Sequence, residues 1–297
     1  MEIETLNAFL TIVREESISS AASVLHVTQP ALSRRMQRLE QELDAKLFER
    51  GRKITLTPAG QMLKERAEEI VSLVERTESD FRSADKACGT ISIGSGGLSA
   101  NIFLSEVMEK FRAENPEVNY QIYVNSAEYV KDMIDRGLLD FGLLLQPVDV
   151  TRYDFIELRE SERTGLFIRR DHPAAKKGFV TAEDIASIPL IIPSRESVRN
   201  DMENRIGIPF SKMDIFASNN LCTNSIIFVK RGTAALLTIE GAVTDYLDDT
   251  MIFLPMRPEI SANTVFVWKK GALSYGATGK FLEFFRKEVR DYRHGIS

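Results

Sequence analysis

Apolar positions follow three different patterns along the chain, and each pattern predicts a different kind of structure. In the first sixty residues, short stripes with the spacing of an amphipathic helix, such as Leu6, Phe9 and Leu10, are separated by tight turns. From Gln61 to about Ala87 a helical pattern continues without Gly or Pro. Beyond residue 89, short apolar runs alternate with amphipathic helices. This organisation predicts two or three domains, which suits 297 residues.

The alternation in the third stretch predicts βαβ units and a largely parallel sheet. Strands are expected over 91–94, 118–124, 138–145, 166–168, 190–192, 234–238, 252–254 and 265–268. Helices are expected over 102–112 and 278–289, with further helix starts after 124 and 192 and near 224. We therefore assign 1–58 to a winged helix-turn-helix domain, 59–88 to a linker helix and 89–297 to an α/β domain.

The linker helix is predicted to mediate dimerisation. Thr57 is a suitable N-cap, and Pro58 is tolerated at the first helical position. The apolar seam has a spacing close to heptads, at Leu63, Ala67, Ile70, Val74 and Phe81. A helix of this length with a narrow seam is not stable alone in water, and a second copy would bury the seam. The alternative is a helix that lies on its own C-terminal domain.

The third short helix has the side chains of a DNA-reading element. Thr28 is expected to cap it, with Pro30 in its first turn, and Ser19 to cap the helix before it. Its apolar stripe, expected to face the core, comprises Leu32, Met36, Leu39 and Leu43. The opposite face and its flanks comprise Ser33, Arg34, Gln37, Arg38 and Gln41. Such side chains hydrogen-bond base edges and phosphates. The alternative is an ordinary solvated polar face.

A basic hairpin follows this helix. Residues 47–57 are expected to form two short strands around a glycine turn, with Arg50, Arg52 and Lys53 at the tip. Such a wing can lie along the DNA backbone or enter the minor groove. The net charge of -5 taken alone argues against nucleic acid. The charge from 28 to 53 is nevertheless positive, and the location of the basic residues matters more than the total.

The segment 21–34, AASVLHVTQPALSR, resembles the signature of the LysR-type transcriptional regulators, and 39–40, 47–50 and 56–60 continue the resemblance. The resemblance implies a double-stranded DNA operator as partner, a homodimer through the linker helix and a homotetramer built as a dimer of dimers. The residues implied to face DNA are Thr28, Gln29, Pro30, Ser33, Arg34 and Arg38. Arg50, Arg52 and Lys53 match the wing, and Gln37 is added by its place on the polar face.

The resemblance also implies that the α/β domain has two lobes, like periplasmic type 2 solute-binding proteins, and binds a small effector between them. The chain would cross between lobes near 158–162 and 262–265. Lobe I would comprise about 89–160 and 265–297, and lobe II about 161–264. Polar helix starts and the family's contact loops give the expected effector-binding residues: Ser95, Ser99, Ala100, Asn101, Ser126, Gln146, Pro193, Ser194, Arg195, Asn219, Asn220 and Thr223.

Free N–H groups at helix starts, together with Arg195, favour a carboxylate or another anion as effector. The alternative for each Ser or Asn is a plain N-cap. We expect an effector-responsive DNA-binding regulator; an effector-independent regulator and a solute-binding protein are the alternatives. The latter needs an export signal, which the N-terminal residues do not resemble, so a cytoplasmic protein is expected. A regulator should lose DNA affinity steeply as the salt concentration rises.

Catalysis is not expected. None of His26, His172 and His294 has a cysteine or carboxylate at metal-ligand spacing. Cys88 and Cys222 are far apart and form no CxxC pair, and neither a GxSxG motif nor a dinucleotide-binding glycine pattern occurs. No apolar run approaches the roughly 20 residues that span a membrane. The sequence therefore predicts a non-enzymatic regulator without metal or cofactor.

Overall fold

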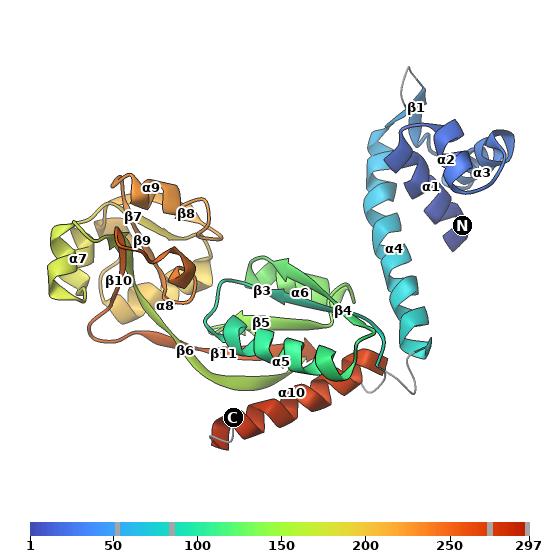
Figure 1. Ribbon diagram of the computed structural model, residues 1–297. Helices are drawn as coiled ribbons and strands as arrows, with labels where there is room; N and C mark the ends of the chain where they lie inside the picture. The colour runs from blue at the N-terminus through green and yellow to red at the C-terminus, as the bar shows by residue number, and fades with distance from the viewer. Residues whose placement is uncertain (51–53, 83–86, 272–275, 295–297) are drawn as a thin grey trace. The chain divides into compact units, whose positions relative to one another are not determined.

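The computed structural model describes residues 1–50, 54–82, 87–271 and 276–294 (Figure 1). The chain divides into two compact units, Met1–Phe81 and Arg82–Ser297. Each unit has its own hydrophobic core, and each is described separately below.

The first unit is a small helical domain with a β-hairpin. Its elements are α1 (Ile3–Glu15), α2 (Ile18–Val24), α3 (Gln29–Glu42), β1 (Phe48–Arg50), β2 (Ile54–Leu56) and α4 (Pro58–Arg82). The strands pair antiparallel, with Phe48 opposite Leu56 and Arg50 opposite Ile54. Side chains from all four helices form one core, which includes Phe9, Ala21, Leu32, Met36, Leu39 and Leu63. The helix-turn-helix and hairpin expected from the sequence are present.

Two local predictions in this unit are wrong. The N-cap of α2 is Ser17 and not Ser19, since the Ser17 side chain accepts a hydrogen bond from the Ser20 amide and the helix starts at Ile18. Leu43 is 39% exposed, although helical spacing placed it on the buried stripe. The helix ends at Glu42, and Asp44 has a positive φ of 46°, so the chain turns before Leu43 can reach the core.

The start of α4 follows the sequence prediction. The Gly60 amide donates to Thr57 Oγ1 at 3.0 Å, and Pro58 is the first helical residue. Leu63, Ala67 and Val71 are buried in the core of the first unit. The N-terminal half of the predicted seam therefore packs inside this unit.

The second unit is an α/β structure built on one continuous path of strands. The strands are β3 (Gly89–Ser95), β4 (Val118–Val124), β5 (Phe141–Leu145), β6 (Tyr153–Arg169), β7 (Leu190–Pro193), β8 (Ile215–Asn219), β9 (Ala235–Ile239), β10 (Met251–Pro255) and β11 (Ser261–Lys269). Their order is β4-β3-β5-β11-β6-β9-β7-β8, and β10 pairs with β6. Parallel pairs, β3 with β4 and β5 and β7 with β8 and β9, lie on both sides of β6 and β11.

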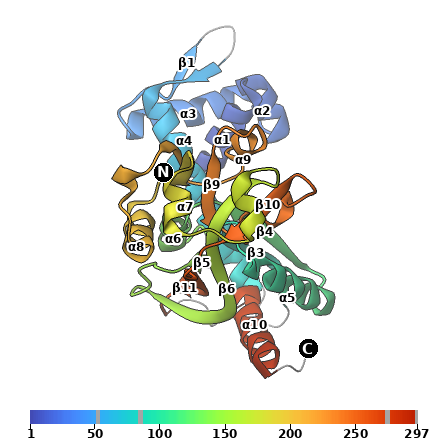
Figure 2. The same cartoon turned by 90° about the vertical axis from the view of Figure 1, so that its left-hand side faces the viewer.

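Two long strands connect two lobes. Strand β6 pairs with β11 from Tyr153 to Arg163 and with β9 from Thr164 to Phe167. In both views β6 runs from the β3–β5 region to the β7–β10 region (Figures 1 and 2). Strand β11 returns the chain from β10 to β5. The two crossings predicted from the sequence are thus confirmed.

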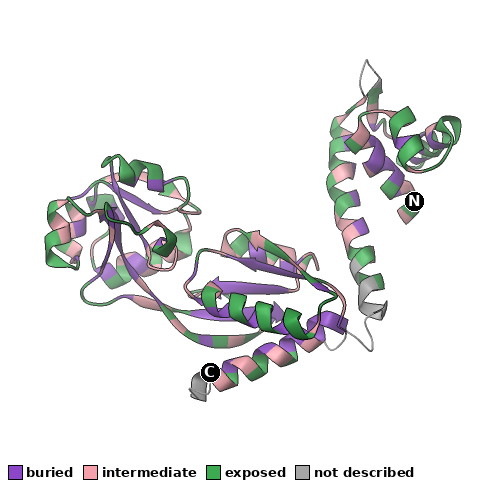
Figure 3. Ribbon diagram, in the orientation of Figure 1, coloured by how far each residue is buried: buried purple, intermediate pink, exposed green. Residues whose placement is uncertain are grey.

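Helices cover the strands in both lobes. They are α5 (Ala100–Glu114), α6 (Ala127–Asp135), α7 (Ala182–Ala186), α8 (Glu196–Ile206), α9 (Ile226–Lys230) and α10 (Gly276–His294), with 3-10 turns η1 (Pro173–Lys177), η2 (Phe210–Lys212) and η3 (Thr244–Tyr246). In lobe I, α5 and α10 pack through Phe111, Phe281 and Phe285, and α6 packs in a separate cluster through Val130 and Ile134. The outer faces of α5 and α10 are exposed or half-buried (Figure 3).

Most predicted strands are present, but several elements differ. The strand expected over 166–168 is the end of β6, which begins at Tyr153, and the strand expected over 265–268 begins at Ser261. The strand expected over 138–145 begins at Phe141, because the amides of Leu138 and Leu139 bond to the Met133 carbonyl and close the turn after α6. Strand β8 and helix α7 were not predicted. Strand β8 lies at the end of the strand order and is nowhere fully buried, so it has no apolar run, and α7 is only five residues long.

Candidate functional site

The outward face of α3 forms a polar and basic surface. Leu32, Met36 and Leu39 hold the helix in the core, so the opposite positions face solvent. The exposed predicted residues are Thr28, Gln29, Pro30, Arg34, Gln37 and Arg38, while Ser33 is half-buried. Thr28 occupies the N-cap position, but its side chain accepts no capping hydrogen bond, so its hydroxyl is free to contact a ligand.

Arg35 is a further exposed basic residue on this helix, and the sequence-based list omitted it. Arg35 follows Arg34 directly and lies off the buried stripe of Leu32, Met36 and Leu39, so helical spacing could have identified it. Within the described part of the chain, the side chains of Arg34, Arg35 and Arg38 make no ion pair. Their charges are therefore available to phosphate groups or guanine edges.

Glu40 holds the hairpin against α3. Its carboxylate accepts a hydrogen bond from the Leu47 amide at 2.8 Å and pairs with Lys46 Nζ at 2.9 Å. Burial raises the pKa of Glu40, but these contacts outweigh it and hold the pKa below its ordinary value. The hairpin is therefore fixed relative to the recognition face. Arg52 and Lys53, and the side chain of Arg50, lie outside the described residues.

The second unit contains a cavity of about 430 Å³ between its two lobes. Seven of the predicted effector residues line it: Ser126, Gln146, Pro193, Ser194, Arg195, Asn219 and Asn220. The other five do not: Ser95, Ser99, Ala100, Asn101 and Thr223. The cavity wall also includes apolar side chains that sequence reasoning did not single out, among them Leu98, Leu143, Leu237 and Ile260.

Ser95 and Asn101 are occupied within their own loop. The Ser95 hydroxyl lies 2.8 Å from both Asn101 Oδ1 and the Gly96 carbonyl oxygen, and Asn101 Nδ2 donates to the same carbonyl at 2.8 Å. Their polarity serves to close the loop before α5. This explains why they do not reach the cavity.

Ser99 instead contacts a buried carboxylate from β6. Its backbone amide donates to Glu162 Oε1, and its hydroxyl lies 3.3 Å from Oε2. The Gly241 amide, from the loop after β9 in lobe II, donates to Oε2 at 3.0 Å. Glu162 is fully buried, and burial raises its pKa above the ordinary value although these donors lower it. Glu162 therefore joins the start of α5 to lobe II.

The lobes approach closely here, and at position 241 only glycine fits. A Cβ at Gly241 would lie 2.2 Å from the Ser99 nitrogen and 2.7 Å from Glu162 Oε1. At Gly97 a Cβ would lie 3.1 Å from the Ala242 Cα. Sequence reasoning did not identify Glu162, because the polar run 159–163 is typical of an exposed segment.

The two arginines in the cavity wall are engaged by carboxylates and carbonyls. Arg195 Nε lies 3.3 Å from Glu128 Oε1, and Arg195 Nη2 donates to the Pro147 carbonyl at 2.7 Å. Arg205 Nε lies 3.0 Å from Asp201 Oδ2, and its Nη1 donates to the Ser261 carbonyl at 2.9 Å. The contacts of Arg195 also link lobe II to lobe I, because Glu128 and Pro147 belong to lobe I.

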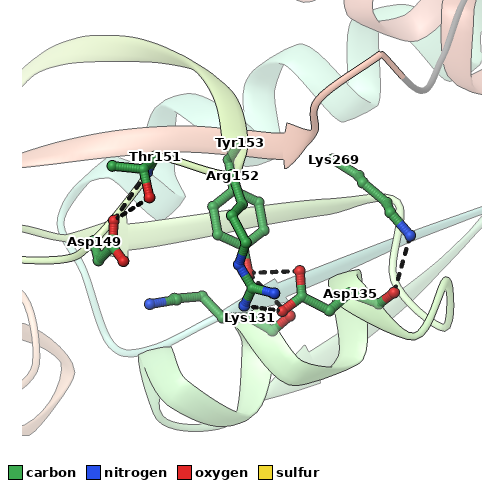
Figure 4. Close-up of polar contacts among 7 residues, drawn as sticks. All are labelled: Lys131, Asp135, Asp149, Thr151, Arg152, Tyr153 and Lys269. Carbon is green, nitrogen blue, oxygen red and sulfur yellow. Dashed lines mark hydrogen bonds and ion pairs between the residues drawn. The ribbon is translucent and has the colours of Figure 1, made fainter.

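A polar network fixes the segment that follows the Gln146–Pro147 wall (Figure 4). The Asp135 carboxylate accepts from Arg152 Nη2 at 2.5 Å and from the Tyr153 hydroxyl at 2.9 Å, and Lys269 Nζ donates to the Asp135 carbonyl at 3.0 Å. Burial and the contact with Asp135 raise the pKa of Tyr153 to about 12. The end of α6 is thus tied to the start of β6 and the end of β11.

The described residues contain no cluster of His, Cys, Asp and Glu able to hold a metal ion. Cys222 lines the cavity, and burial raises the pKa of its thiol. No helix in the described ranges has the length and apolar character needed to cross a membrane.

Family models match both units. A model described as "LysR substrate binding domain" matches residues 84–290, and one described as "Bacterial regulatory helix-turn-helix protein, lysR family" matches residues 3–61. The first match includes the residues that line the lobe cavity, and the second includes helix α3.

Several proteins with assigned names are similar to this chain. The chain is 27% identical over 224 residues to the HTH-type transcriptional regulator YtlI of Bacillus subtilis. This match covers 73% of this chain and 72% of YtlI. It is 29% identical over 284 residues to an uncharacterized HTH-type transcriptional regulator, YbhD, of Escherichia coli. This match covers 94% of this chain and 89% of YbhD. The structure of full-length CbnR in complex with its target DNA matches with a TM-score of 0.73 at 20% identity. This match covers 98% of this chain and 99% of CbnR.

Proposed function

Since the chain belongs to the LysR family of DNA-binding transcriptional regulators, we propose that the exposed face of α3 reads an operator in the major groove. Gln29, Ser33 and Arg34 contact base edges, Thr28 contacts a phosphate, and Pro30, Gln37 and Arg38 complete the face. The basic hairpin residues Arg50, Arg52 and Lys53 contact the flanking backbone or minor groove. The observation that carries this proposal is a row of exposed arginines that form no ion pair with any described residue, on a helix whose other side is buried.

The experiment compares Arg34→Ala with Arg14→Ala, a matched loss of an exposed arginine from α1. Operator duplexes are first selected from a random DNA pool with the full chain. Arg34→Ala should lose about 1–3 kcal/mol of specific affinity, from about fivefold to about 150-fold, because one base contact is removed. Arg14→Ala should bind like the unmodified protein. Equal affinity of Arg34→Ala and the unmodified protein for the selected operator would refute the role of Arg34.

The lobe cavity is the proposed site of a small effector. Its support is the volume of about 430 Å³ between two lobes joined by β6 and β11. In this proposal the effector contacts seven residues of the wall: Ser126, Gln146, Pro193, Ser194, Arg195, Asn219 and Asn220. The other five predicted residues do not line the cavity, namely Ser95, Ser99, Ala100, Asn101 and Thr223. Among them, the hydrogen bonds of Ser95, Ser99 and Asn101 set the shape of the loop before α5.

The proposed assembly is a homotetramer, a dimer of dimers, with the domains bounded at 1–58, 59–88 and 89–297. The C-terminal half of α4 supports the dimer, since Leu73 is 47% exposed there. A second contact is supported by the two ends of the strand order in the α/β unit. At β4, Ile122 and Val124 are each 65% exposed; near β8, Phe216 is 46% and Ile227 59% exposed. A two-fold axis that places β4 of one copy beside β8 and α9 of another buries both patches twice.

The proposed mechanism follows from these parts. An effector in the cavity changes the angle between the lobes, and the β4 and β8 patches, which lie on different lobes, move with it. The spacing of the two dimers on DNA changes in response. One dimer is expected to contact half-sites about one helical turn apart, or a multiple of it.

A further inference from the structure

We propose that the effector of the lobe cavity is an uncharged, mainly apolar organic molecule with a hydrogen-bond-accepting carbonyl group, and that carboxylates and amines bind there poorly. This inference rests on the proposed function, because it assumes that the cavity holds the effector. It departs from the anionic effector that the sequence favours. The reason is that the charged groups and helix starts around the cavity already have partners inside the protein.

The start of α5 is occupied by Glu162. The Ser99 amide, which precedes the first turn of α5, donates to Glu162 Oε1, and the Ser99 hydroxyl lies against Oε2. Glu162 is fully buried. It contacts Ser99 and Gly241, and the chain neighbours of these two residues, Leu98 and Ala242, line the cavity, so Glu162 lies directly behind the cavity wall. An effector carboxylate at this helix start would have to displace a buried carboxylate and would lie beside a like charge.

The other helix starts at the cavity also carry their own carboxylates. Glu128 lies in the first turn of α6, and Glu196 lies in the first turn of α8. Acidic side chains in these positions interact favourably with the positive end of a helix. The attraction of α6 and α8 for an external anion is therefore reduced by the protein itself.

The charged residues of the wall pair with each other. Among the described residues that line the cavity, the cations are Arg195 and Arg205 and the anions are Glu128 and Asp201. Arg195 pairs with Glu128, and Arg205 pairs with Asp201. A charged effector of either sign would meet no free counter-charge, and a charge that leaves water without a partner is strongly disfavoured.

The remaining surface suits a neutral molecule. Leu145, Val198, Leu221 and Ile239, which are only half-buried, supply apolar contacts, and the side chains of Ser126, Ser194 and Asn220 supply polar groups at the wall. The Nε–H group of Arg195 is buried and lacks a hydrogen-bond acceptor, although it lies near the Glu128 carboxylate. Buried donors in proteins are normally satisfied, so an acceptor oxygen of the effector is favoured here, and a neutral carbonyl supplies it without placing a second carboxylate beside Glu128.

The experiment uses ligands that share an apolar scaffold and differ in their head group: the acid and the amide share the carbonyl and differ in charge, and the amine is charged and lacks the carbonyl. Each apolar scaffold is supplied as a carboxylate, a primary amide and a primary amine, such as benzoate, benzamide and benzylamine, or hexanoate, hexanamide and hexylamine. The full chain is screened by thermal shift, and binding constants are measured by calorimetry. Amide forms should raise Tm and bind about tenfold or more tightly than the acid and amine forms of the same scaffold.

Two variants test the cause. Glu128→Gln removes the ion-pair partner of Arg195, so carboxylate forms should gain about tenfold in affinity. Glu162→Gln removes the carboxylate at the start of α5, so it should also bind the carboxylate ligands more tightly. If Glu162→Gln does not fold, Glu128→Gln serves as the independent test. Glu109→Gln, an exposed carboxylate on α5 that does not line the cavity, should leave every binding constant unchanged.

The outcomes separate this inference from the proposed function. Carboxylates that bind the unmodified protein as tightly as the amides would overturn the inference and leave the effector site standing. Carboxylate affinities that stay the same in Glu128→Gln would show that internal pairing does not set the selectivity. A library in which no scaffold binds in any form would refute the cavity as an effector site, and the inference with it.

Discussion

Glu162 shows how one side chain can take part in both lobes of a protein. Its donors are Ser99 on the lobe I side and Gly241 on the lobe II side, and the backbone of Glu162 belongs to the strand that joins them. A carboxylate without water is destabilised in its ionised form, so burial raises its pKa even though N–H donors oppose the shift. The contact that holds the lobes together is therefore sensitive to pH.

The sign of that dependence is testable. A carboxyl group whose pKa is raised on folding stabilises the folded state fully below its unfolded value, near 4.5, and this contribution is lost as the pH rises through the folded pKa. Glu162→Gln does not titrate. The Tm of the unmodified protein minus that of Glu162→Gln should therefore decrease as the pH rises from 4 towards neutrality.

Thermal unfolding of both proteins across this pH range measures the difference. Glu109→Gln is the control, since its carboxylate is exposed and its loss should leave the pH profile unchanged in shape. A difference in Tm that stays constant or grows with pH would contradict the assignment of a raised pKa to Glu162.

At the scale of elements, the two ends of the strand order are the least buried parts of the α/β unit. Strand β4 has exposed side chains at Ile122 and Val124, and β8 has one at Phe216. Edge strands with apolar side chains are sites where other chains can pair or pack. The proposed tetramer covers these edges, which gives a structural reason for their composition.

Val124→Lys should therefore weaken the tetramer. A lysine at the centre of a contact between copies introduces a charge without a partner, so light scattering after gel filtration should detect dimers at concentrations where the unmodified protein is tetrameric. The dimer should remain because α4 is unchanged. Phe179→Lys is the matched control, since Phe179 is 37% exposed but lies on neither edge. Tetramers of unchanged stability in Val124→Lys would count against the proposed contact.

At the scale of the whole molecule, DNA reading and ligand binding belong to separate compact units. In the proposed mechanism, an effector acts on DNA through a change that the assembly transmits. The net charge of -5 also shows that a local basic surface, and not the total, serves an operator.

DNA footprints with and without effector test this transmission. The probe is the amide that binds most tightly in the matched ligand screen, added at about 100 times its dissociation constant so that the site is filled. The protected half-sites should shift in spacing, or a site between them should become hypersensitive as the bend changes. Ser194→Trp, which would fill the cavity, should make the footprint insensitive to the amide. Identical footprints in both conditions would refute the allosteric mechanism.

The sequence by itself determined the features that depend on local periodicity. The stripe of Leu32, Met36 and Leu39 and the cap at Thr57 arise from side chains a few residues apart, so helical spacing was sufficient to predict them. The alternation beyond residue 89 likewise predicted the α/β unit, whereas its two lobes and the crossings between them were implied only by the family resemblance. The same reasoning failed at Leu43 and at Ser19, where a helix boundary differed by one or two residues.

Only the tertiary structure decided which polar residues reach the cavity. Ser95 and Ser126 both lie near helix starts, yet Ser95 bonds within its loop and Ser126 lines the cavity. The contact between Glu162 and Gly241 joins positions 79 residues apart in the chain. No local pattern specifies such a pair, because it depends on how two lobes meet and on the absence of a Cβ at one residue.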